Sequence, residues 1–286
     1  MKIIDKFNKG KTVYSFEVFP PKKDNDIETV FDALEGLQGL NPDFISVTYG
    51  AGGNIADNKT CQIAEIIKHR YNIEPLAHLT CINSGKDEVL DILSQLKDGE
   101  VSNILALRGD QNPDLKTKTD FLHASDLTKF ILENGDFSVA GACYPEGHAE
   151  SESKISDVLN LKKKIDSGTS HLISQLFFDN EYFYAFQEHC RLAGITVPIQ
   201  AGIMPVVNVK QIQRLVSLCG ASLPIKFVKI MNRYGGNRDA LRDAGIAYAI
   251  DQIVDLIANG VDGIHLYTMN NPYVAIKITQ AIQNLL

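Results

Sequence analysis

The sequence lacks the features that mark several classes of protein. Its 286 residues include five cysteines, and no two of these form a C-x-x-C pair. Neither a disulfide framework nor an iron–sulfur cluster held by this chain is therefore expected. No two histidines have the spacing of metal ligands, so no metal site is predicted. The chain also has no long uncharged apolar run and no signal peptide at its N-terminus, and we expect a cytoplasmic protein that does not enter a membrane.

Positive charge is scarce as well. Lys and Arg number 28 against 35 Asp and Glu, which leaves a formal net charge of −7. General nucleic-acid binding requires a basic surface and is therefore not expected. Apolar residues make up 44% of the chain, enough to bury a large core. The length allows one large domain or two ordinary ones.

Short runs rich in branched and aromatic residues predict eight strands. They lie at residues 13–18, 44–48, 75–80, 103–107, 137–144, 171–178, 198–204 and 263–268. Segments with helical periodicity lie between and after them, at residues 57–70, 87–96, 126–134, 152–167, 180–193, 208–218, 239–259 and 272–285. Residues 231–238 are rich in Gly, Asn and Arg and predict an irregular insertion. Alternating strands and helices are typical of a parallel sheet.

A parallel sheet of this kind can be an open doubly wound sheet or a closed barrel. Eight strand–helix units in a chain of this length favour a closed (β/α)8 TIM barrel. No low-complexity linker divides the sequence, so we predict a single domain over residues 1–286. In such a barrel the carboxyl ends of all strands open onto one face, which holds the active site.

Polar residues stand where the predicted strands end. They are Glu17, Thr48, His78, Arg108, Gly109, Asp110, Tyr144, Gln175 and Tyr267. Residues far apart in the sequence would then line one pocket at the mouth of the barrel. Because single residues of these types are common at turns, the expectation rests on their recurrence from strand to strand.

Glu17 lies among apolar neighbours, Phe16, Phe19, Pro20 and Pro21. If its side chain faces the pocket, poor hydration favours the protonated carboxyl, which suits a general acid near neutral pH. A solvent-facing or salt-bridged glutamate is equally compatible with this segment.

Other strand ends offer groups that could hold a ligand. Arg108 and Asp110 could clamp a phosphate and supply a fixed anion, or they could form an ion pair at the rim. Gln175 has the donor and the acceptor needed to read the edge of a heterocycle. His78 also fits an ordinary buried histidine, and Tyr267 could stack on a flat ring or simply pack.

Six stretches together resemble the methylenetetrahydrofolate reductase family, in the order in which that family carries them. They are Phe16-Glu17-x-Phe19-Pro20-Pro21, the run from Val47 to Gly53, Arg108-Gly109-Asp110, Tyr144-Pro145-Glu146-x-His148, Gln175-x-Phe177-Phe178-Asp179 and Tyr267-Thr268-x-Asn270. Each stretch alone is weak evidence, but jointly they are specific and cover nearly the whole chain.

The resemblance implies a barrel with non-covalent FAD that reduces 5,10-methylenetetrahydrofolate to 5-methyltetrahydrofolate with NADH or NADPH, in the one-carbon metabolism that serves methionine biosynthesis. By position, Glu17 resembles the general acid, Asp110 the carboxylate facing pterin and flavin, Gln175 a pterin ligand and Tyr267 part of the pocket wall. The positions that match FAD contacts are Thr48, His78, Leu107, Arg108, Gly109, Asp110, Tyr144, His148, Asp157 and Lys164. Family members often assemble as homo-oligomers, which is expected here too.

Two departures from the family pattern concern the electron donor. Val209 stands where other members have a phenylalanine that stacks on substrate, and Asn271 stands where arginine is common. An alternative is therefore a flavin-holding subunit reduced by a partner electron-transfer protein. A flavin-free pterin-binding methyltransferase on the same barrel is a second alternative.

Overall fold

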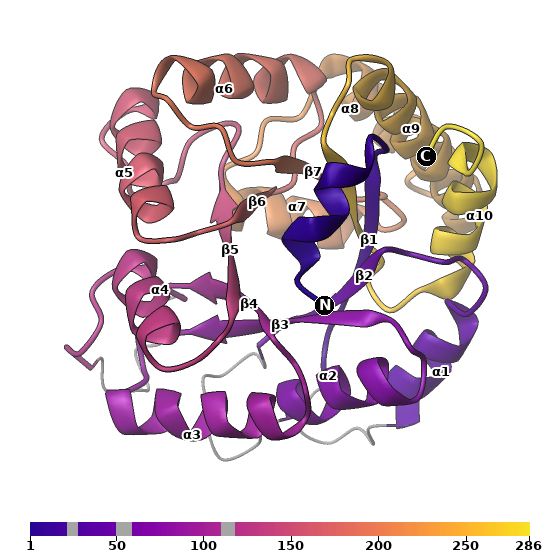
Figure 1. The fold of residues 1–286 in the computed structure, drawn as a ribbon. Coiled ribbons are helices and arrows are strands. Elements are labelled where there is room, and N and C mark those ends of the chain that lie inside the picture. The colour runs from indigo at the N-terminus through magenta and orange to yellow at the C-terminus, as the bar shows by residue number, and fades with distance from the viewer. Residues whose placement is uncertain (22–27, 50–58, 110–117) are drawn as a thin grey trace.

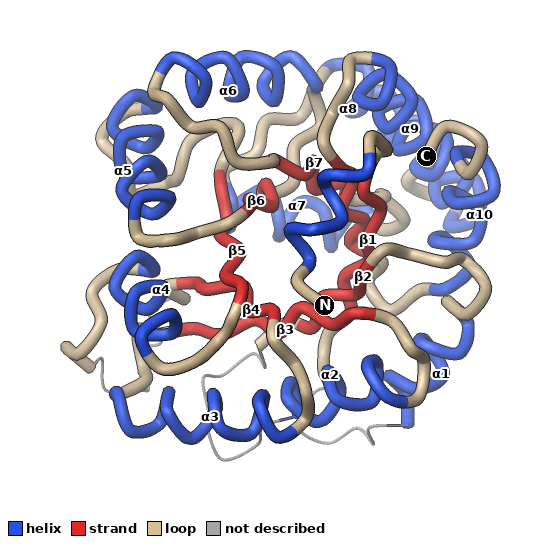
Figure 2. Tube along the Cα trace, viewed as in Figure 1, coloured by secondary structure: helices blue, strands red, loops and turns tan. Residues whose placement is uncertain are grey.

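The computed structural model describes residues 1–21, 28–49, 59–109 and 118–286. Its eight strands are all parallel and close into a barrel in sequence order, as the TIM-barrel prediction requires (Figures 1 and 2). The strands are β1 Val13–Val18, β2 Phe44–Val47, β3 Glu74–Thr80, β4 Asn103–Leu107, β5 Ser138–Cys143, β6 His171–Ser174, β7 Ile199–Ile203 and β8 Gly263–Tyr267. Their pairing therefore brings all carboxyl ends to one face.

Helices surround the barrel as an outer ring (Figure 2). They are α1 Glu28–Gly36, α2 Lys59–His69, α3 Lys86–Asp98, α4 Ala124–Glu133, α5 Lys154–Asp166, α6 Asn180–Leu192, α7 Val209–Cys219, α8 Ile225–Tyr234, α9 Arg238–Ala258 and α10 Pro272–Ile282. In α3, the apolar residues Val89, Ile92, Leu93 and Leu96 recur at spacings of three and four and are buried. Burial of this apolar surface is the main force that holds the ring on the barrel.

The 3-10 segment η1, Ile3–Lys9, crosses the end of the barrel opposite the strand carboxyl ends (indigo in Figure 1). The Ile3 side chain is fully buried among residues from the first halves of the strands, including Phe44 and Leu76. Its backbone N–H donates to the Asn103 side chain at 2.8 Å. The segment therefore closes this end of the barrel with apolar contacts and one buried hydrogen bond.

His171 lies beneath this segment, between the rings of Phe7 and Phe44, whose centroids are 5.3 and 6.4 Å away. Burial lowers its pKa from the ordinary 6.5 to about 3, with a smaller contribution from His265. Below pH 6.5 the unfolded chain takes up a proton that the folded chain refuses until about pH 3, so this group makes stability fall as the pH falls.

Because of His171, we expect the free energy of unfolding to be about 2 kcal/mol lower at pH 5 than at pH 7. Urea unfolding at the two pH values should show a smaller loss in His171→Gln than in the wild type. His69→Gln, at a half-exposed histidine, should keep the wild-type difference. Equal pH differences in all three proteins would contradict the assignment.

Three features differ from the sequence prediction: residues 231–238, the segment that forms α1, and the end of the sixth strand. Residues 231–238 are not an irregular insertion, because α8 runs to Tyr234 and α9 begins at Arg238. Apolar Phe227 and Met231, four residues apart, hold α8 on the barrel. The sequence pattern also gave no helix at α1, whose nine residues are too few for a clear period.

The sixth strand ends at Ser174, four residues earlier than predicted. The backbone N–H of Leu176 donates to the side-chain oxygen of Gln175 at 2.8 Å, and not to a neighbouring strand. Leu176 and Phe178 remain apolar because they pack in a second cluster with α7 and α8, which explains why the run looked like strand.

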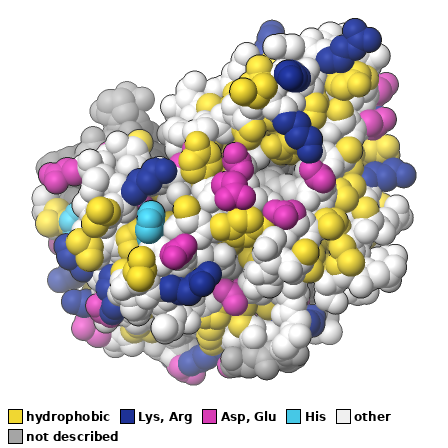
Figure 3. All heavy atoms as spheres, turned by 90° about the horizontal axis from the view of Figure 1, so that it is seen from above, with side chains coloured by type: hydrophobic (Ala, Val, Ile, Leu, Met, Phe, Trp, Pro, Cys, Tyr) yellow, Lys and Arg dark blue, Asp and Glu magenta, His cyan; other side chains and the backbone are white. Residues whose placement is uncertain are grey.

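Acidic and basic side chains are interspersed on the face seen in Figure 3. Among the described residues, no helix combines the length and the apolar character of a bilayer span. In the same ranges, no group of three or more His, Cys, Asp and Glu side chains could hold a metal ion.

Candidate active site

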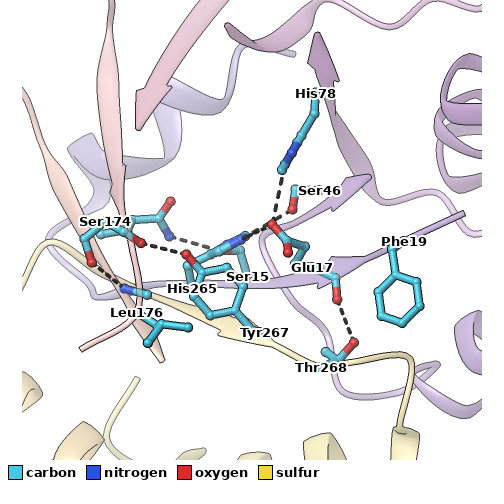
Figure 4. Close-up of polar contacts among 12 residues, drawn as sticks. Ser15, Glu17, Phe19, Ser46, His78, Ser174, Leu176, His265, Tyr267 and Thr268 are labelled. Carbon is cyan, nitrogen blue, oxygen red and sulfur yellow. Dashed lines mark hydrogen bonds and ion pairs between the residues drawn. The ribbon is translucent and has the colours of Figure 1, made fainter. Parts of the chain in front are cut away.

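Glu17 is the second-last residue of β1 and points into the mouth of the barrel. Its side chain is 19% exposed, and its Oε2 lies 3.6 Å from Nε2 of His78 and 3.6 Å from Nε2 of His265. Figure 4 shows both imidazoles directed at this carboxylate. The sequence left open whether Glu17 faces solvent or the pocket, and the pocket-facing position is the one observed.

His78 reaches Glu17 from β3 and is almost fully buried. Burial lowers its pKa from 6.5 to about 4, and the opposing pull of Glu17 is the smaller effect. His78 is therefore neutral near pH 7, and its contact with Glu17 is a polar contact rather than a salt bridge. Its Nε2 has no hydrogen-bond partner among the residues that the structure describes, which leaves a buried polar atom aimed at the mouth.

The side chain of Tyr267 is fixed at its hydroxyl. Its hydroxyl donates to the backbone carbonyl of Ser174 at 2.7 Å and so bridges β8 to the end of β6 (Figure 4). The bridge passes over Gly202 of β7, where an added Cβ would lie 2.7 Å from the Tyr267 hydroxyl. The position next to Ser174 is Gln175, so Tyr267 fixes the wall from which Gln175 projects.

Gln175 directs its side-chain oxygen back to the N–H of Leu176. Its own N–H donates to the Cys143 carbonyl at 2.7 Å. Among the residues that the structure describes, the amide NH₂ of Gln175 has no hydrogen-bond partner, so its donors face no group that would compete with a ligand.

A cavity of about 590 Å³ opens beside the ends of β4 and β5. Six of the predicted cofactor-binding residues line it: Leu107, Arg108, Tyr144, His148, Asp157 and Lys164. Lys163 and two further carboxylates, Glu150 and Glu152, join them. The volume is within the usual range for a small-molecule site.

Lys164 is the buried cation of this cavity. Its ammonium donates to the backbone carbonyl of Ala142 at 2.7 Å, and burial lowers its pKa. Two turns earlier, Asp157 in the first turn of α5 accepts from the hydroxyl of Ser151 at 2.7 Å. Both charges are thereby held by neighbours rather than free to swing into solvent.

Arg108 forms a two-pronged ion pair with Glu150, at 2.6 and 2.8 Å. The pairing lowers the pKa of Glu150. This acid is not the one considered from the sequence, where the partner of Arg108 was Asp110. Asp110 lies outside the described residues.

The structure brings the predicted residues together as two groups on one face. Glu17, His78 and Tyr267 meet at the ends of β1, β3 and β8, and the six cavity residues meet at β4, β5 and α5. Thr48 and Gly109 follow β2 and β4 on the same face and are not among the cavity residues.

Four buried polar residues near Glu17 were not predicted: Ser15, Ser46, Gln200 and His265. Ser15 and Glu17 are two apart in β1, and Ser46 is the β2 residue opposite Glu17. Ser15 could have been found from the sequence, because residues two apart in a strand, such as Ser15 and Glu17, face the same side.

Comparisons with known proteins agree with this architecture. A family model described as methylenetetrahydrofolate reductase matches residues 2–283. The chain is 35% identical over 273 residues to 5,10-methylenetetrahydrofolate reductase of Pectobacterium carotovorum subsp. carotovorum, covering 96% of this chain and 91% of that protein. The Escherichia coli K12 enzyme of the same name is 34% identical with the same coverage.

A longer relative and a solved structure of low sequence identity also match the chain. Methylenetetrahydrofolate reductase (NADH) 1 of Arabidopsis thaliana is 35% identical over 297 residues, and the chain spans 50% of its length. A Clostridium thermocellum protein whose structure binds two copies of 5-methyl-5,6,7,8-tetrahydrofolic acid superposes with a TM-score of 0.70 at 16% identity, covering 99% of each chain, which shows the fold. On the match over nearly its whole length, the chain belongs to the methylenetetrahydrofolate reductase family of oxidoreductases.

Proposed function

We propose that the chain reduces 5,10-methylenetetrahydrofolate to 5-methyltetrahydrofolate with a non-covalently bound FAD. The observation that carries this proposal is the carboxyl of Glu17, mostly buried between two imidazoles at the mouth of the barrel. On the same face, the cavity of Arg108 and Lys164 could hold an anionic cofactor.

The residues of the cavity fit a dinucleotide. Arg108, Lys163 and Lys164 are three cations around one space, which suits a diphosphate. The ring of Tyr144 packs edge-on against His148, at 4.6 Å between centroids, and provides a flat wall. A bound flavin supplies the redox chemistry, while the protein sets its position and environment.

Glu17 acts on the folate. Reduction requires the five-membered ring of the substrate to open, which leaves a cation at N5. Glu17 protonates the departing N10, and the neutral His78 beside it accepts or donates a hydrogen bond without adding charge. Gln175 offers its free amide donor to the pterin, and Asp110, assigned from the family resemblance, provides the anion that stabilises the cation.

The test is an absorption spectrum of the purified chain, followed by anaerobic titration with NADH and with NADPH. We expect a flavin band that NADH bleaches, as the name of the plant relatives suggests, and that methylenetetrahydrofolate restores. A band that only a partner protein bleaches would favour the electron-transfer alternative. A protein that stays colourless after incubation with FAD would reject the proposal.

Lys164→Met should weaken FAD binding at least about tenfold, because a buried charge-assisted hydrogen bond to the diphosphate is lost. Methionine keeps most of the side-chain length, so packing on β5 should change little. Lys162→Met is the matched control, since Lys162 belongs to the same run of lysines but pairs with Asp166 on the outer face of α5. Equal FAD dissociation constants for the two variants in a fluorescence titration would argue against this assignment.

A further inference from the structure

Gln200 is a fully buried polar residue in the interior of the barrel, on β7. Its side chain crosses β8 at Gly263, which is paired with Gln200 on one side and with Val13 of β1 on the other. A Cβ at position 263 would lie 2.7 Å from Gln200 Cγ and 2.7 Å from the Val13 carbonyl oxygen. Gly263 therefore leaves the gap through which Gln200 reaches β1.

The orientation of the Gln200 amide follows from its neighbours. Its Nε2 lies 3.5 Å from the Val13 carbonyl oxygen and 3.1 Å from Ser15 Oγ. A carbonyl can only accept, so the NH₂ group must face this side and the two N–H bonds go to Val13 and Ser15. The Gln200 Oε1 is left without a partner among the described residues.

Ser15 links Gln200 to His265 by hydrogen bonds. Because Ser15 Oγ accepts from Gln200, its own proton is available to the nearest acceptor. That acceptor is Nδ1 of His265 at 2.7 Å, since the Ile264 carbonyl is more distant at 3.4 Å. A neutral imidazole that accepts at Nδ1 carries its proton on Nε2.

The Nε2–H of His265 then faces two oxygens, Ser46 Oγ at 3.4 Å and Glu17 Oε2 at 3.6 Å. We propose that Gln200 is a positioning residue that, through Ser15, holds His265 in the Nε2–H tautomer and so turns a polar N–H, rather than a lone pair, toward the ionised Glu17 carboxylate. The inference rests on the proposed role of Glu17 as the acid that gives up a proton to the substrate.

Other groups around Glu17 are less firmly set as donors. His78 Nε2 lies at the same 3.6 Å from Glu17 Oε2, but among the described residues no hydrogen bond fixes which of its two ring nitrogens carries the proton. Burial keeps the pKa of Tyr267 far above neutrality, and its proton is donated to Ser174. Thr268 donates to the backbone carbonyl of Glu17, not to the carboxylate (Figure 4).

Burying the Gln200 Oε1 without a partner costs free energy of folding, so a role in folding alone does not explain a glutamine at this position. Leucine has a similar volume and would leave no buried polar atom there. A residue retained for packing alone should therefore be replaceable without any effect on Glu17, whereas a positioning residue should not.

The experiment has a structural and a kinetic arm. In protein labelled with ¹⁵N-histidine, nitrogen–proton correlations report the tautomer of His265, assigned by the signal that disappears in His265→Gln. We expect the Nε2–H tautomer in the wild type and a shift toward Nδ1–H in Gln200→Leu. The high-pH limb of the pH profile of folate reduction should move upward by roughly one pH unit in the variant, because a lone pair of His265 then faces the carboxylate in place of the N–H.

Gln252→Leu is the matched control, because Gln252 is also buried and donates to a backbone carbonyl, that of Phe177 at 3.0 Å, outside this chain of hydrogen bonds. It should change neither the tautomer nor the pH profile. An Nδ1–H tautomer in the wild type, or a Gln200→Leu protein that matches Gln252→Leu in both measurements, would overturn the inference. The tautomer measurement needs neither flavin nor folate, so an inactive wild type with the expected tautomer would reject only the proposed function.

Discussion

Glu17→Gln should lose folate reduction by about 10² to 10⁴-fold while it retains its flavin. The substituted amide keeps the shape of the side chain between His78 and His265 but has no proton to give to N10. Stopped-flow mixing of the reduced variant with methylenetetrahydrofolate measures the affected step directly.

The same protein provides the control for this variant. On the proposed function, reduction of the flavin by the nicotinamide does not involve N10 of folate and should proceed at close to the wild-type rate. Full folate activity in Glu17→Gln would exclude Glu17 as the acid. A comparable loss in both half-reactions would indicate instead that the substitution disturbs the flavin site.

Gly245→Ala should destabilise the fold by about 2 kcal/mol or more, although Gly245 lies inside a helix. Alanine favours helix over glycine by about 1 kcal/mol. At this position, however, α9 packs so closely that an added Cβ would lie 1.7 Å from the Val206 carbonyl oxygen and 2.7 Å from its carbon. Because these are backbone atoms, they cannot turn aside as a side chain would, and the overpacking penalty exceeds the gain in propensity.

Thermal unfolding should therefore show a fall in the melting temperature of roughly 4 °C or more for Gly245→Ala. Gly236→Ala is the matched control, because nothing lies within 4 Å of the Cβ position there and the backbone is not in the left-handed region. It should leave the melting temperature near that of the wild type. A melting temperature of Gly245→Ala above that of the wild type would contradict this prediction. It would mean that the connection between β7 and α7 moves away from α9 at little cost in free energy.

The Gly245 contact also concerns the site. Val206 lies two residues before Asn208, whose side chain caps α7 by accepting from the N–H of Gln211. The helix that starts at Val209 is one of the two places where this chain departs from the family pattern. The stability variant should therefore also be assayed for its folate KM.

Much of the fold follows from local patterns. Alternating strands and helices predicted the barrel, and polar residues at seven of the eight predicted strands indicated where its mouth would lie. The pattern failed where tertiary packing replaced a local rule. Leu176 and Phe178 are apolar because they contact α7 and α8, not because they continue β6, and α8 was obscured by the Gly, Asn and Arg that follow it.

The residues of the candidate site also fall into two sets, those that local sequence marks and those that only the fold brings together. Glu17, Arg108 and Tyr144 could be singled out because each stands at a strand end and in a recognisable stretch, whereas Lys164 was assigned by its position in the family pattern alone. Glu150 was not singled out, because its partner Arg108 lies 42 residues away and nothing local marks the pair. Gln175 was correctly placed at the rim, but the turn that its side-chain oxygen makes with Leu176 is visible only in three dimensions.

The sequence by itself determined that the chain forms a parallel barrel and that Glu17 stands at a strand end, because apolar periodicity and strand-end residues are properties of neighbouring positions. Only the tertiary structure decided what surrounds that carboxyl. Ser15 meets Gln200 across 185 residues and His265 across 250, and such contacts depend on the closure and register of the barrel, which no local pattern encodes.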